Sequence, residues 1–153
     1  MLFRSAAQKV NPNIKTKIVW AFTWYDPGKE AEAAKALIDQ GADVIAQHTD
    51  STAIVQMAEK AGVYAFGQAS DMDKFAPKAV LTSVENNWGP YYVDRVKAVA
   101  NGTWSQKDTW HGIGDGMVVI SDLDSQTPAD LRSKVKKLQA DLASGKEIGR
   151  AHV

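Results

Sequence analysis

Short apolar runs, separated by polar and glycine-rich segments, dominate the pattern of the chain and predict β-strands. The runs are rich in β-branched or small apolar residues, and turn-forming or polar residues follow them. The predicted strands cover residues 17–22, 43–47, 63–66, 78–84, 109–113 and 117–121. The last two strands flank a glycine-rich turn, which is typical of a hairpin.

Four other segments carry apolar residues every three or four positions, which predicts amphipathic helices. Asp26 is a suitable N-cap for the first helix, because Pro27 follows it at the first helical position. Gly41 and Gly62 are expected to end the first and second helices. The predicted helices cover residues 27–40, 51–61, 88–100 and 127–143. The last helix is expected to turn four apolar side chains inward: Leu131, Val135, Leu138 and Leu142.

Strands and helices therefore alternate, with short connections between them. This order predicts an α/β fold in which right-handed crossovers build a mainly parallel sheet with helices on both faces. The strand runs are continuously apolar, as expected for parallel strands that are covered on both sides. A length of 153 residues suffices for one domain with a sizeable core.

Composition and charge exclude several classes of function. The chain has 18 basic and 18 acidic residues, so no basic excess indicates a nucleic-acid partner. Cysteine is absent, which removes disulfides, thiol catalysis and cysteine metal sites. No stretch is apolar for long enough to cross a membrane as a helix. The sequence contains no phosphate-binding loop and no zinc-protease or nucleophile-elbow motif, so no cofactor is expected.

Both ends of the chain resemble translated sequencing adapters rather than protein sequence. The first segment is Met1–Ser5 and the second is Ile148–Val153. We expect both to be foreign to the protein and therefore exclude them from the interpretation of the fold. The natural part is then expected to span residues 6–147.

Aromatic and polar residues follow four of the predicted strands. In an open α/β sheet, ligands bind beyond the carboxyl ends of the strands, so we expect these residues to converge. Trp24 either covers the edge of the sheet or stacks on a planar ligand, and its position alone favours neither. The complete set of candidate ligand-binding residues is Trp24, Gln47, His48, Asp50, Asp71 and Asn86.

Two of the candidates, Asp71 and Asn86, determine which ligand the edge suits. A lone loop aspartate such as Asp71 is more often a cap or turn residue than a binding residue. Beside Asn86 and an aromatic plate, however, it would complete the usual composition of a small-molecule pocket. A carboxylate accepts N–H bonds, and an amide both donates and accepts them. Together these groups suit a heterocycle such as a purine better than a sugar.

Catalysis and metal binding are weaker interpretations of the same residues. His48 beside Asp50 could be a general base with the group that orients it. No activated nucleophile accompanies the pair, because Thr49 and Ser51 are better interpreted as helix-start residues. His111 lies far away in the sequence, so the histidines do not form a metal-ligand cluster.

Five segments resemble the basic-membrane-protein family, whose members are substrate-binding proteins of ABC importers and are also described as PnrA-like lipoproteins. The segments are residues 20–30, 37–45, 47–51, 66–72 and 87–92. The Gln-His-Thr-Asp and Gly-Gln-Ala-Ser-Asp-Met stretches within them are similar to the purine-binding branch of the family. The resemblance covers nearly all of residues 6–147, in order.

The resemblance implies a two-lobed periplasmic-binding-protein type I fold, of which this chain would be most of the C-terminal lobe. Its partners would be the missing N-terminal lobe, a purine nucleobase or nucleoside in the cleft between the lobes, and a membrane permease. The protein would be periplasmic or a membrane-anchored lipoprotein, and not an enzyme. Trp24 stands at the family's stacking position and Asp71 at its acidic position, whereas Asn86 stands where relatives carry a lysine or an acid. Gln47, His48 and Asp50 would line the same edge.

Three other functions remain open at this point. The first is a sugar- or autoinducer-binding protein of the same fold. The second is the effector domain of a transcription regulator, which would need a helix-turn-helix upstream. The third, from a different class, is an α/β enzyme that uses His48 and Asp50.

Overall fold

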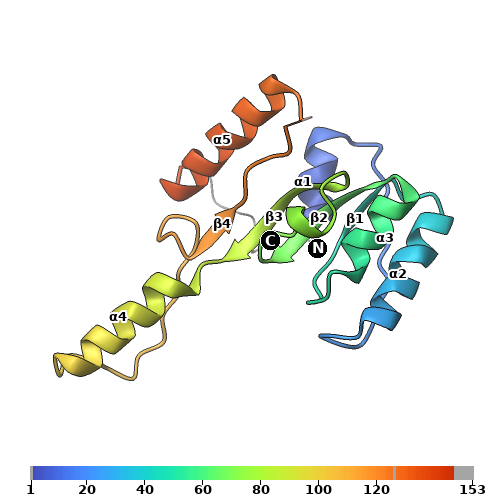
Figure 1. Ribbon diagram of the computed structural model, residues 1–153. Helices are drawn as coiled ribbons and strands as arrows, with labels where there is room; N and C mark the ends of the chain where they lie inside the picture. The colour runs from blue at the N-terminus through green and yellow to red at the C-terminus, as the bar shows by residue number, and fades with distance from the viewer. Residues whose placement is uncertain (1, 126, 147–153) are drawn as a thin grey trace.

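The computed structural model describes residues 2–125 and 127–146 and contains a four-stranded sheet (Figure 1). Its strands lie in the order β1 (Val44–Ala46), β2 (Tyr64–Ala69), β3 (Val80–Asn86) and β4 (Val118–Ile120). The β1–β2 and β2–β3 pairs are parallel, whereas β4 runs antiparallel to β3. The predicted α/β fold with a mainly parallel sheet is therefore confirmed.

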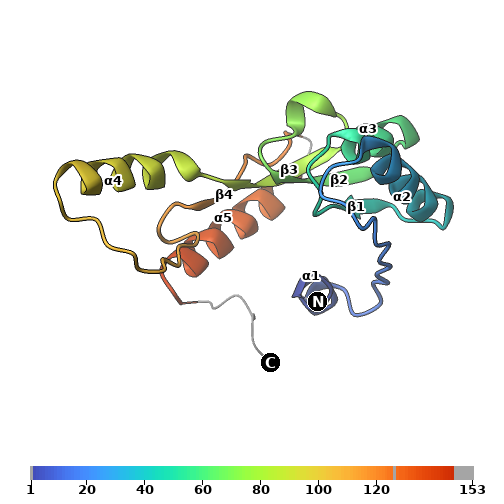
Figure 2. The same cartoon turned by 90° about the horizontal axis from the view of Figure 1, so that it is seen from below.

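Helices lie on both sides of this sheet, as predicted. They are α1 (Leu2–Val10), α2 (Pro27–Asp39), α3 (Ala53–Ala61), α4 (Trp88–Ala100) and α5 (Ala129–Ala143), with a short 3-10 helix, η1 (Asp73–Phe75). Helix α3 packs on β1 and β2, and α2 packs on α3. Figure 2 shows α1 and α5 on the opposite side of the sheet, while α4 projects away from it. No helix in the described part of the chain is long and apolar enough to cross a membrane.

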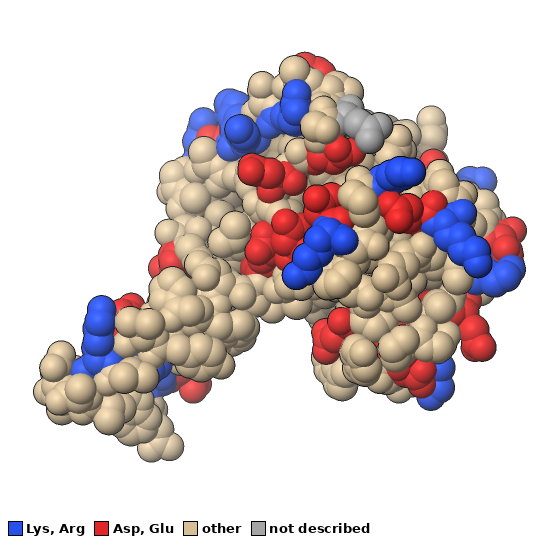
Figure 3. All heavy atoms as spheres, viewed as in Figure 1, with Lys and Arg blue, Asp and Glu red and all other residues tan. Residues whose placement is uncertain are grey.

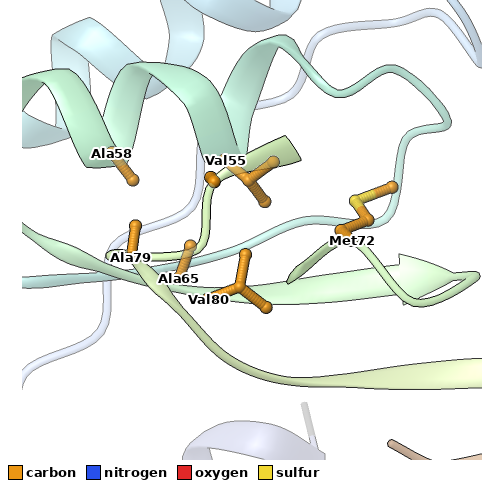
Figure 4. Packing of buried hydrophobic residues seen from close by; sticks show 7 residues of the cluster. Val55, Ala58, Ala65, Met72, Ala79 and Val80 are labelled. Carbon is orange, nitrogen blue, oxygen red and sulfur yellow. The ribbon is translucent and has the colours of Figure 1, made fainter. Parts of the chain in front are cut away.

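The main core lies between α3 and the strands β2 and β3 (Figure 4). Small side chains at Ala58, Ala65 and Ala79 let the helix approach the sheet closely, and each is at most 1% exposed. Val55 is fully buried among them. Burial of one such side chain contributes roughly 1.5–3 kcal/mol to folding. The core therefore anchors β2 and β3, whose carboxyl ends carry two of the predicted ligand-binding residues.

A second cluster fixes α2 against α3 and β1. Ala34, Ile45 and Ile54 are buried in it, and Leu37 and Ile38 of α2 pack against them. Ala34, Leu37 and Ile38 recur at helical spacing along one side of α2. The cluster places the first turn of α2 beside the loop that follows β1, which matters for the site described below.

The predicted strand over residues 17–22 is not formed. Ile18, Trp20 and Phe22 are 57%, 72% and 91% exposed, and the segment has no partner in the sheet. Phe22 has φ 52°, outside the extended region of the backbone. The prediction rested on β-branched and aromatic residues, whose preference reflects packing on a neighbouring strand rather than an intrinsic backbone property.

The predicted hairpin over residues 109–121 is wrong as well. Residues 109–113 form no strand, and β4 pairs with β3 instead. The N–H groups of Met117 and Val118 both donate to the carbonyl of Gly112, which closes a turn but starts no ladder.

Of the two C-terminal helices, α4 has the predicted bounds and α5 begins two residues later than predicted, but both bury little. Leu131 and Leu138 of α5, both expected to face inward, are 46% and 50% exposed, whereas Val135 and Leu142 are partly covered. No residue of α4 is buried either. Figure 3 shows the α4 arm with mostly uncharged side chains on the visible face. Periodicity therefore located these helices but did not reveal how little they pack.

Candidate ligand-binding site

Three of the predicted residues come together where the chain enters α2 and leaves β1. The ring of Trp24 lies edge-on to the imidazole of His48, with 6.2 Å between the ring centroids. The main-chain N–H of Asp50 donates to the main-chain carbonyl of Trp24 over 2.9 Å. Trp24 is nevertheless 71% exposed, so its ring is held at one edge and remains open to a ligand.

Glu30, in the first turn of α2, joins these two loops. Its Oε2 accepts hydrogen bonds from Thr49 Oγ1 at 2.7 Å, from Ser51 Oγ at 2.7 Å and from the N–H of Ser51 at 3.2 Å. Its Oε1 accepts the N–H of Asp26 at 2.9 Å. Asp26 in turn caps α2 by accepting the N–H of Lys29, as predicted from the sequence.

The environment of Glu30 favours its charged form. Burial alone raises the pKa of a carboxyl group, and Glu30 is fully buried. The hydrogen bonds from Ser51, Asp26 and Thr49 outweigh this effect and hold the pKa of Glu30 below its usual range. None of the Lys and Arg side chains in the described ranges forms an ion pair with Glu30. Hydroxyl and backbone donors alone therefore stabilise this buried charge.

The sequence analysis did not identify this role of Glu30. The available signals were an acidic residue in the first turn after the Asp26 cap and two hydroxyl residues flanking Asp50. Neither signal shows that the two loops meet, because Glu30 and Ser51 are 21 residues apart.

Gln47 stabilises the loop after β1 rather than presenting a free amide. Its Nε2 donates to the carbonyls of Thr49 and Ser51 at 2.9 and 3.0 Å. Its Oε1 is buried and has no hydrogen-bond partner within the described residues. Gln47 therefore shapes the loop that carries His48 and Asp50.

Asp71 lies on the loop between β2 and η1. Its side chain is exposed, and Oδ1 accepts the N–H of Asp73 at 3.1 Å. This hydrogen bond closes a turn, which is the role that the sequence favoured for a lone aspartate. The second carboxylate oxygen is not used by this turn, so turn formation and ligand binding by Asp71 are compatible.

Ser83 holds the Asp71 loop against the sheet. Its fully buried Oγ accepts the N–H of Met72 at 3.1 Å. A Cβ at Gly67 would lie 2.1 Å from this Oγ, so only glycine allows the two strands and the loop to approach in this way. At the start of the loop, Ala69 has φ 64°, a left-handed conformation that is sparsely populated for residues other than glycine.

Asn86 ends β3 on the same edge of the sheet as Asp71. Ala69 of β2 and Glu85 of β3 are the last pair of residues that these strands share. Asn86 follows Glu85 directly, and Asp71 comes two residues after Ala69. The Asn86 side chain is exposed and makes no hydrogen bond within the part of the chain described here. Strand β1 ends at Ala46, which pairs with Phe66 of β2. Phe66 lies three residues before Ala69, so β1 ends about 10 Å short of the end of β2.

The six predicted residues thus form two groups on one edge. Trp24, His48 and Asp50 lie together on loops that Gln47 and Glu30 stabilise, and Asp71 and Asn86 lie at the ends of the next two strands. No hydrogen bond or ring contact between the two groups is found among the described residues. A hollow of about 270 Å³ lies elsewhere, between α4 and residues 111–117, and none of the six lines it.

The chemistry available at this edge is recognition. Trp24 offers an exposed aromatic face, Asp71 and Asp50 offer carboxylates, and Asn86 offers a free amide. Thr49 and Ser51 direct their hydroxyls at Glu30, and His48 makes no hydrogen bond to Asp50 within the described residues. No group of three His, Asp or Glu side chains in the described ranges is placed to hold a metal ion.

Known proteins match the chain over nearly its whole length. The family model for PnrA-like ABC transporter substrate-binding proteins matches residues 1–150. A purine-binding protein of Brucella abortus (strain 2308) is 51% identical over 143 residues, which are 94% of this chain and 41% of that protein. A protein of Haloferax volcanii, provisionally named as an ABC transporter glucose-binding protein, is 33% identical over 129 residues, 84% of this chain and 33% of its own length.

A solved structure agrees with these matches. The ABC transporter solute-binding protein from Conexibacter woesei superimposes with a TM-score of 0.70 at 25% identity, over 94% of this chain and 49% of that one. The chain therefore spans less than half the length of each of these relatives.

Proposed function

This chain belongs to the PnrA-like family of ABC transporter substrate-binding proteins, and from this membership we propose that it forms one wall of a purine-binding cleft. The observation that carries the proposal is the exposed ring of Trp24, held edge-on by His48 at the carboxyl edge of the sheet. Base–aromatic stacking contributes about 1–3 kcal/mol per base. A purine nucleobase or nucleoside stacked on this ring would direct its polar edge toward Asp71 and Asn86.

The proposed mechanism is capture without chemistry. A second lobe, from the part of the relatives' length that this chain does not span, closes over the ligand by a hinge. The closed form then docks on a membrane permease, which receives the purine. This activity takes place on the outer side of the cytoplasmic membrane, with the protein either free in the periplasm or anchored by lipid.

The name of the Brucella relative supports a purine ligand, since the match, 51% identical over 143 residues, spans 94% of this chain. The name of the Haloferax relative favours a sugar at lower identity. The exposed indole of Trp24 offers a flat aromatic face, and a flat heterocycle fits such a face better than a polyhydroxylated ring does.

Calorimetry distinguishes the two ligand classes. A full-length homologue that carries these loops is titrated with adenine, adenosine, guanosine and glucose. Saturable heat with at least one purine and none with glucose is expected. Saturable binding of glucose, with no heat from any of the purines, would defeat the purine proposal.

A further inference from the structure

We propose that Glu30 is a positioning residue that holds the Trp24 loop and the Asp50 loop in the arrangement that binds the ligand. The inference rests on the proposed function, because the two loops carry three of the proposed ligand-binding residues. Glu30 touches no ligand-facing surface itself, since it is fully buried. Its effect would therefore be transmitted through the loops.

Glu30 forms hydrogen bonds to both loops at once. One carboxylate oxygen accepts the N–H of Asp26, two residues after Trp24. The other accepts three donors from Thr49 and Ser51, which flank Asp50 on either side. A single charged group thus fixes the chain immediately after Trp24 and on both sides of Asp50.

Within the described residues, few other hydrogen bonds or ring contacts join the two loops. The N–H of Asp50 donates to the carbonyl of Trp24, and the Trp24 and His48 rings form a T-shaped pair with 6.2 Å between their centroids. Both contacts lie in exposed segments, where water competes for the same groups. The buried carboxylate accepts charge-assisted hydrogen bonds, which are roughly twice as strong as neutral ones.

Replacement of Glu30 by glutamine would leave a hydrogen-bond donor without an acceptor. Glutamine has nearly the same shape, but its amide nitrogen can only donate. At least one of the donors that now faces the carboxylate would lose its acceptor in a buried place. The expected result is local loosening of the two loops, while the core between α3 and the sheet stays intact.

Amide hydrogen exchange on the full 153-residue chain tests the tether without any ligand. In Glu30→Gln we expect exchange at the Asp50 N–H to accelerate about tenfold, the factor that loss of a charged hydrogen bond predicts. Exchange at the Val63 N–H, which bonds to Ala58 in the core region, should accelerate by no more than the fall in the global free energy of unfolding of the same variant accounts for. Glu32→Gln, at an exposed position of the same helix, is the matched control and should change neither rate.

The pH profile separates positioning by the charge from a merely structural role. In the unmodified chain, protection at Asp50 should fall as the pH drops through the range where carboxyl groups protonate, whereas in Glu30→Gln this step should vanish. Thr49→Val, which keeps the shape and removes one donor to Glu30, provides a milder variant if Glu30→Gln fails to fold.

Adenosine binding by the same variants, followed by NMR titration, completes the experiment. We expect Glu30→Gln to weaken adenosine binding about tenfold and Glu32→Gln to leave it unchanged. Calorimetry on the full-length homologue decides the proposed function, and the exchange data decide the role of Glu30 whether or not this chain alone binds adenosine. Unchanged Asp50 exchange in both Glu30→Gln and Thr49→Val would overturn the inference, whatever adenosine does.

Discussion

The main-chain N–H of Asp50 donates a 2.9 Å hydrogen bond to the main-chain carbonyl of Trp24, although the two residues are far apart in the sequence. This bond brings the loop after β1 beside the loop that leads into α2. It also brings Trp24 and Asp50, whose side chains are both exposed, together at one edge of the sheet. The stacking prediction for Trp24 depends on this arrangement.

Trp24→Ala should weaken purine binding by about 1–3 kcal/mol, the range measured for one base stacked on an aromatic ring. The free energy of unfolding should change by no more than about 0.5 kcal/mol, because the side chain is 71% exposed. NMR titration with adenosine and urea unfolding measure the two effects. Trp110→Ala, at a position 94% exposed and outside the site, is the matched control and should affect neither. Equal binding by the two variants contradicts the stacking role of Trp24.

Asp71→Asn separates binding from turn formation. The amide oxygen of asparagine can still accept the N–H of Asp73, so stability should change by less than about 0.5 kcal/mol. Purine affinity should fall by about 1.5–3 kcal/mol, because a hydrogen bond to a charged acceptor is lost. Asp73→Asn, a second exposed carboxylate on the neighbouring turn, is the control. If Asp71→Asn binds adenosine as tightly as the unmodified chain, the residue is only a turn former.

Gly67→Ala should destabilise the chain by about 2 kcal/mol or more, since overpacking of this severity forces backbone to shift. The added Cβ would lie 2.1 Å from Ser83 Oγ and 3.0 Å from Met72 Cβ. Urea unfolding gives the free energy directly. Gly112→Ala, where a Cβ meets no atom within 4 Å, should cost no more than about 0.5 kcal/mol. A Gly67→Ala variant as stable as Gly112→Ala would show that the loop before Asp71 is not held as described.

The stability of the chain should depend on the charge of Glu30. The pKa of Glu30 is lowered in the folded state, so its contribution is complete above the ordinary carboxyl value, about 4.3. The contribution is then lost as the pH falls through the lower, folded value. Glu30→Gln should therefore cost about 2 kcal/mol or more near pH 7, and the difference should shrink below about pH 4. Urea midpoints across this range measure it, and a difference that does not change with pH speaks against a charged Glu30.

Helices α2 to α5 were predicted well from the sequence because their signals are local, whereas α1 was not among the predicted helices. Asp26, Pro27 and the glycine after the last turn define α2 within about one residue, and the same holds for α4. The strand predicted over residues 17–22 failed because a strand needs a partner that the segment itself does not specify.

The candidate site likewise has parts that could be predicted from the sequence and parts that could not. The positions of Trp24, Asp71 and Asn86 at the ends of apolar runs were visible in the sequence, and the parallel sheet places two of them on one edge. The contact between Glu30 and Ser51 was not visible, because it depends on how α2 packs against the loop after β1. Tertiary packing determines such contacts, and residue spacing does not reveal them.

The central claim is that a purine stacks on Trp24, and the nuclear Overhauser effect between ligand and protein protons tests it most directly. Adenosine is added to the isotope-labelled chain until the NMR signals of the protein no longer shift. Overhauser contacts from the base protons to protein protons are then recorded. The account predicts cross-peaks from the adenine H2 and H8 protons to the indole ring of Trp24, and their loss in Trp24→Ala. Cross-peaks only to other exposed aromatic residues, such as Trp88 and Tyr92 on α4, would contradict it.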